Sequence, residues 1–144
     1  MITEIDIVKA IAEKLKEQFP YKVHSNSAKE GFTKECFFIE VVSPDAGSIG
    51  TEMREDEMSV RVTFFALTDS LEKERWKIKQ KLSVIFLLGL KVTEEFFVSW
   101  EEPLSFNFTS SGNLEMLMQL HYIQDLPEED GQPLEELEVS YREE

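Results

Sequence analysis

The spacing of apolar positions predicts an amphipathic helix at the start of the chain. Between residues 3 and 19, apolar side chains recur every three or four positions, and charged residues fill most of the positions between them. The predicted apolar stripe consists of Ile5, Val8, Ile11 or Ala12, Leu15 and Phe19. Thr3 followed by Asp6 has the form of a capping box, and Pro20 disfavours a helical conformation of the residue before it. We therefore expect a helix over residues 3–19 with one apolar face.

Strands should follow this helix. Residues 21–25 predict a short strand, and residues 35–43 predict a longer one with apolar side chains on both faces, which is typical of a central strand. Residues 57–67 alternate apolar and polar positions, which predicts a strand with one buried face. Between the two longer strands, residues 44–56 combine turn-forming with charged residues, so we expect an exposed loop or the tip of a long hairpin there.

A second amphipathic helix is expected in the middle of the chain. Asp69, with Glu72 three residues further on, can cap its start, and Gly89 suits its C-terminal cap. The four lysines of this segment fall mostly outside its apolar stripe. That inner stripe consists of Leu71, Ile78, Leu82 and Ile85.

Three further alternating runs follow the second helix. Residues 96–100, 104–108 and 114–122 are separated by turn-forming residues, which predicts an antiparallel meander. From residue 125 onward, acidic residues are interrupted by proline and glycine. We therefore expect a single domain over residues 1–124 and an acidic C-terminal arm over residues 125–144.

The predicted order of helix, three strands, helix and three strands indicates an α+β fold. Strands this close in sequence are expected to pair antiparallel, which gives an antiparallel or mixed sheet with both amphipathic helices packed on one face. The chain of 144 residues is long enough for one core, and 42% hydrophobic residues are too many for a disordered chain.

The chain is strongly acidic, with 29 Asp and Glu residues against 15 Lys and Arg residues and a net charge of -14. Binding to phosphate backbones depends on clustered Lys and Arg, so this charge argues against general nucleic-acid binding. It favours solubility and basic partners. The N-terminus lacks the pattern of a signal peptide, and the longest apolar run, residues 84–90, is too short to cross a membrane, so we expect a cytoplasmic protein.

Residues capable of catalysis or metal binding are few and scattered. The single cysteine, Cys36, lies in an apolar run, which predicts a buried thiol and a reducing compartment. His24 and His121 lie on predicted strands outside any known motif, and we interpret both as sheet residues rather than general bases. One cysteine with two distant histidines does not form a structural zinc site, and no glycine-rich phosphate loop is present. We therefore expect no catalytic residue, metal or cofactor.

Several segments of the sequence resemble one known family. They are the end of the first helix at residues 15–20, Gly31-Phe32 ahead of Cys36-Phe37-Phe38-Ile39-Glu40, and Arg54 ahead of the strand at residues 60–65, with Leu134-Glu135-Glu136-Leu137-Glu138-Val139 near the end. In this order they resemble the phage tail terminator family found in prophages of Gram-positive bacteria. The likeness covers most of the chain.

The resemblance implies a small α+β subunit without enzyme activity. Such a subunit assembles as a ring, often a hexamer, on the last ring of the tail tube, ends tube growth and supports joining to the head. The implied partners are other copies of the chain, the tail tube protein and connector proteins. The protein would lie in the bacterial cytoplasm during assembly and in the virion tail or tail-like particle afterwards. If DNA passes through the ring, an acidic lumen would keep it from binding.

Candidates for the subunit interface follow from exposure and loop position. The main alternative to a tail terminator is an acidic inhibitor that mimics DNA, which the net charge allows. A more remote one is an enzyme that uses His121 with a nearby glutamate. The interface candidates are Ile49, Met53, Arg54, Arg61, Leu137 and Val139.

Overall fold

The computed structural model describes residues 1–25, 35–66 and 72–126, and contains two helices and seven strands in this part of the chain. The predicted cap at Asp69, the stripe residue Leu71, and the arm residues Leu137 and Val139 lie outside the described residues. The elements are α1 (Glu4–Gln18), β1 (Lys22–Ser25), β2 (Cys36–Ile49), β3 (Met53–Phe65), α2 (Glu72–Ile85), β4 (Leu90–Thr93), β5 (Phe96–Val98), β6 (Ser105–Phe108) and β7 (Leu114–Asp125).

Five strands form the main sheet in the order β1-β2-β3-β7-β6, and β4 pairs with β5 in a separate two-stranded ribbon. Strand β1 runs parallel to β2, whereas β2, β3, β7 and β6 pair antiparallel with their neighbours. The sheet is therefore mixed. The expectation that neighbouring strands all pair antiparallel was wrong for β1 and β2.

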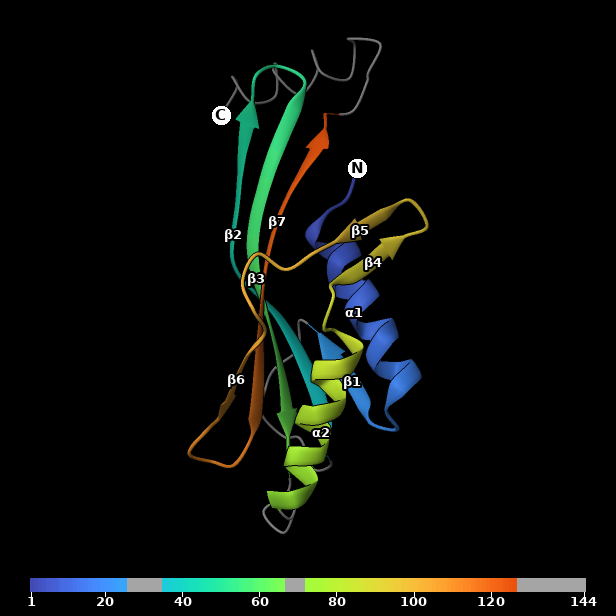
Figure 1. The fold of residues 1–144 in the computed structure, drawn as a ribbon, viewed down its shortest axis with the longest axis vertical. Coiled ribbons are helices and arrows are strands. Elements are labelled where there is room, and N and C mark those ends of the chain that lie inside the picture. Colours follow the sequence, from blue (N-terminus) through green and yellow to red (C-terminus); the bar gives the residue numbers. More distant parts are fainter. Residues whose placement is uncertain (26–34, 67–71, 127–144) are drawn as a thin grey trace.

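Both helices and the β4–β5 ribbon lie on the same side of the main sheet (Figure 1). This confirms the predicted α+β class with two helices on one face. On that side, the core contains the apolar side chains of α1 and α2 together with alternate residues of β2, β3 and β7. Helix α1 begins as predicted, because the backbone N–H of Thr3 donates to the Asp6 carboxylate at 2.9 Å.

Helix α2 packs on the sheet through residues spaced four apart. Ile78, Leu82 and Phe86 are buried, whereas Ile85 of the predicted stripe is only partly buried. This spacing places the three buried side chains along one face of the helix. The opposite face, with most of the lysines, is left exposed.

The segment at residues 44–56 is a hairpin and not a loop. Strand β2 continues to Ile49, β3 starts at Met53, and β7 pairs with β3 as far as Asp125 (Figure 1). Residues 45–49, 53–57 and 121–125 thus form a three-stranded extension, which we call the distal sheet. Its many Asp, Glu, Gly and Ser residues have low strand propensity, but two ladders of backbone hydrogen bonds hold them in the sheet.

The predicted meander is correct only for its last two strands. β6 pairs with β7, but β5 pairs with β4, a strand that the sequence interpretation missed. The connection from β5 to β6 touches the main sheet at one bridge, Trp100 to Leu120, and the Trp100 indole N–H donates to the carbonyl of Phe86. Trp100 therefore ties this connection to the end of α2.

Gly89 permits a close approach between the end of α2 and β5. Its φ is +136°, and a Cβ atom there would lie 2.2 Å from the carbonyl oxygen of Val98. We expect Gly89→Ala to lower the free energy of unfolding by about 1–3 kcal/mol, because the strained backbone and the contact must both be relieved. Urea unfolding measures this change.

The control for this prediction is Gly47→Ala, because a Cβ atom at Gly47 meets nothing within 4 Å. Alanine restricts the unfolded chain more than glycine does, so this variant should be neutral or more stable by up to about 1 kcal/mol. An equal loss of stability in both variants would contradict the role assigned to Gly89.

Candidate functional site

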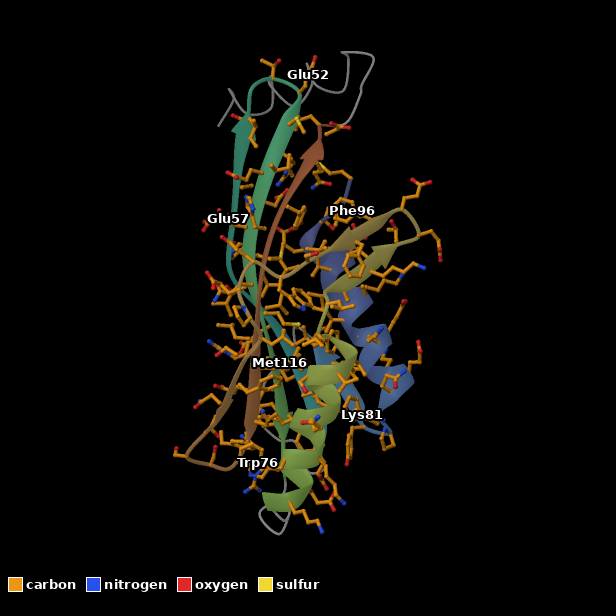
Figure 2. The ribbon with its side chains drawn as sticks, in the orientation of Figure 1. Glu52, Glu57, Trp76, Lys81, Phe96 and Met116 are labelled. Atoms are coloured by element: carbon orange, nitrogen blue, oxygen red, sulfur yellow. The ribbon has the colours of Figure 1, made fainter. Side chains whose placement is uncertain are left out.

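The two faces of the distal sheet differ in chemistry. Side chains alternate along each strand, so Arg54, Asp56 and Gln124 lie on the side of the helices, while Glu57 and His121 lie on the outer face. Figure 2 shows Glu57 pointing away from the side that carries the helices. The distal sheet therefore has an inner polar network and an outer charged surface.

The inner network joins the start of the chain to β3 and β7. Arg54 binds the Asp56 carboxylate through two hydrogen bonds of 3.0 and 2.6 Å. The side-chain amide of Gln124 donates to Asp56 at 3.1 Å and to the carbonyl of Ile2 at 2.9 Å, and its oxygen accepts from the N–H of Ile2 at 2.9 Å. The Asp56 side chain is only 4% exposed, so these donors compensate a buried charge.

The same network affects a neighbouring tyrosine. Tyr122 is buried next to Asp56 in the register of β3 and β7. Burial, with the negative charge of Asp56 as a further cause, raises the pKa of Tyr122 to about 12. Its hydroxyl therefore stays neutral, and the network on this face serves to hold the distal sheet and the N-terminus together.

On the outer face, His121 lies between two carboxylates. Its Nε2 atom is 2.6 Å from Glu55 and 3.9 Å from Glu57. The pKa of His121 is raised above its usual value, chiefly by the hydrogen bond to Glu55. Partial burial lowers this pKa by a smaller amount, and the negative charges of Glu101 and Glu57 raise it further. The sequence interpretation treated His121 as a sheet residue, and the structure adds that it pairs with these carboxylates.

This ion pair makes the stability of the distal sheet depend on pH. Because the folded-state pKa of His121 is raised, the pair stabilises the protein fully below the unfolded pKa of about 6.5, and this contribution is lost as pH rises through the folded pKa. His121→Gln should therefore cost up to about 1 kcal/mol at pH 6 and nearly nothing at pH 9, since the pair is partly exposed. Urea unfolding at the two pH values tests this.

Glu55→Gln provides the matched control, because it removes the nearest carboxylate and keeps the imidazole. In this background, the pH dependence of the His121→Gln effect should become much smaller. An unchanged dependence would show that another group is responsible for it.

Glu55, Glu57 and His121 are also the one group of metal-ligand types found close together in the described part of the chain, with ligand atoms within 4.8 Å of one another. The hydrogen bond between His121 and Glu55 accounts for this proximity without an ion. The carboxylates are exposed, so we assign the cluster no metal.

Apolar side chains lie beside these charges on the outer face. Ile49 is paired with Met53 across the hairpin, and Ile123 lies opposite Glu55 on β7. All three are exposed, Ile123 to 44%. Two of the interface candidates, Ile49 and Met53, thus lie next to each other on the outer face, and the sequence interpretation missed Ile123.

The two arginine candidates have partners within the chain. Arg54 belongs to the inner network, and Arg61 binds Glu40 at 3.0 Å across β2 and β3. Both arginines contribute an ion pair to the sheet. They do not lie together with Ile49 and Met53, because Arg54 is on the other face and Arg61 is further along β3.

A second surface lies on α2, and the sequence interpretation did not identify it. Exposed lysines run along the helix, and they are followed by exposed apolar side chains, among which Leu88 is 79% exposed. An open groove of about 670 Å³ adjoins these apolar residues and has Trp100 and Leu104 on its far side. We call this surface the α2 face, and it consists of Lys73, Lys77, Lys81, Val84, Leu87 and Leu88.

None of the helices in the described residues is long and apolar enough to cross a membrane. Comparison with known proteins gives a matching family model and several matching solved structures. A family model described as "Phage tail terminator protein" matches residues 6–132. A solved structure whose name states no function shares 16% sequence identity, covers 89% of this chain and 100% of its own, and has a TM-score of 0.53. At this identity the likeness concerns the fold alone. No curated protein matches the sequence.

Proposed function

Because this chain belongs to the phage tail terminator family, we propose that it forms a ring on the end of the tail tube, stops tube growth and supports joining to the head. The family match is the observation that carries this proposal, since it covers most of α1, all of α2 and the seven strands of the described residues. Its partners would be further copies of the chain, the tail tube protein and connector proteins. The family is structural, and we propose no catalytic role.

The fold supports a role in assembly. The distal sheet extends away from α2, and its outer face exposes Ile49, Met53 and Ile123 (Figure 1). Exposed apolar side chains grouped on one surface are typical of protein interfaces. The family match does not favour the alternative of an acidic inhibitor that mimics DNA.

Binding to tail tubes tests the proposal. Tubes assembled from the tail tube protein are mixed with this chain carrying a gold-labelled tag and are imaged by electron microscopy. We expect label at one end of each tube and none along its length. Label spread along the tubes, or no label on them, would contradict the proposed function.

The net charge of -14 suggests how DNA passes such a ring. Carboxylates around the lumen would repel the phosphate backbone, so DNA would cross the ring without being retained. The cytoplasm of the host is the proposed place of assembly, and the tail or tail-like particle is its final location. A structure of the assembled ring with a basic or neutral lumen would contradict this view of the charge.

A further inference from the structure

We further propose that the α2 face of one copy binds the outer face of the distal sheet of the next copy. This inference rests on the proposed ring. The partner at this surface is thus a second copy of the same chain. Charge and the placing of apolar side chains support this contact.

The two surfaces have opposite charge. Helix α2 carries five Lys and Arg residues against two Glu residues, although the whole chain has a net charge of -14. The outer face of the distal sheet carries Asp45, Glu55, Glu57 and Asp125, and His121, where it is protonated, offsets only part of this charge. Opposite potentials of this kind steer two surfaces together and fix their register.

Each surface also carries exposed apolar side chains beside its charges. Lys77 precedes Val84 on α2 by about 10 Å at the helical rise per residue. On β3, Met53 precedes Glu57 by about 13 Å at the rise of a strand. These similar spacings allow Met53 to meet Val84 while Glu57 faces Lys77.

The positions of the two surfaces make this contact head-to-tail. The α2 face is on the helix side near one end of the molecule, and the distal sheet is at the other end with its outer face on the opposite side (Figures 1 and 2). Two copies joined through this contact leave one surface of each kind unused. Such a head-to-tail contact adds further copies, and it forms the proposed ring where the rotation between copies closes.

Charge reversal tests this contact. One variant carries Asp45→Lys with Glu57→Lys on the distal sheet, and the other carries Lys73→Glu with Lys77→Glu on α2. Each variant alone should associate at least about tenfold more weakly than the wild type, because like charges meet in the contact. Sedimentation at raised concentration, with and without tail tubes, measures association.

Mixing the two variants should restore assembly, because the reversed sheet of one matches the reversed helix of the other. This recovery also shows that both variants are folded. The control is Lys9→Glu with Lys16→Glu on α1, which changes the net charge as much as the helix variant does and should leave assembly unchanged. Higher salt should weaken wild-type assembly, since these charges are exposed.

The outcome separates this inference from the proposed function. If every variant still forms rings on tubes, or if mixing restores nothing while the wild type assembles, the proposed contact is wrong and the tail terminator stands. If the wild type neither assembles nor binds tubes, the proposed function falls, and the inference falls with it.

Discussion

Replacing Phe37 with alanine should lower the free energy of unfolding by about 3–5 kcal/mol, which is the usual cost of removing a buried aromatic ring. Phe37 is fully buried, and its ring centroid lies 5.0 Å from that of Phe19 and 5.1 Å from that of Phe64. These residues connect the end of α1 to the centre of the sheet. The change leaves a cavity that the rigid neighbouring strands cannot close. Urea unfolding measures this loss, provided that the slope of the unfolding free energy against urea concentration is the same in both proteins.

Two control variants show whether the loss comes from the cavity. Phe37→Leu retains most of the volume and should cost less than about 1.5 kcal/mol. Phe97→Ala removes the same ring from a position that is 57% exposed and should cost about 1 kcal/mol or less. If Phe97→Ala were as damaging as Phe37→Ala, the core around Phe37 would not be the main source of stability.

Replacing Arg54 with alanine should cost about 2–4 kcal/mol, because it leaves the buried Asp56 carboxylate with Gln124 as its remaining side-chain donor. The value lies below that of a fully buried pair, since 26% of the Arg54 side chain is exposed. Urea unfolding at pH 7 measures this loss.

Arg61→Ala is the matched control, because it removes the same residue type from the same strand. Its partner Glu40 is 24% exposed, so water can solvate the carboxylate when the arginine is removed. The expected cost is at most about 1 kcal/mol. Equal losses for the two arginines would contradict the view that burial of Asp56 makes the inner network important.

Local patterns in the sequence were sufficient to predict much of the core. The capping box at Thr3 and the buried Cys36 follow from spacing and composition, and the structure agrees with both. The predicted stripe of α1 was correct only in part, because Ile11 and Leu15 are buried as expected, whereas Ile5 is 75% exposed and Ile7 is buried instead. The parallel direction of β1 was missed because alternation of side chains carries no information on strand direction. The distal sheet was missed in part because its stability comes from pairing with β7, which is distant in the sequence.

The candidate site depends even more on contacts between distant residues. Asp56 and Gln124 are 68 positions apart, and His121 and Glu55 are 66 positions apart, so no motif connects them. A weak signal was present, because Asp56 and Gln124 occupy positions that are apolar elsewhere along β3 and β7. The exposure of Leu87 and Leu88 could not be predicted without knowing where α2 ends.

The length of tail tubes gives the most direct test of the central claim. Tube protein that polymerises without a terminator should form tubes of uncontrolled length. When this chain is added during growth, the mean tube length should fall as the concentration of the chain rises. Electron microscopy of tubes grown with wild-type chain and with the mixed charge-reversed variants measures this. Shorter, capped tubes are the predicted result. Tubes that grow to the same length at every concentration of the chain would contradict the account.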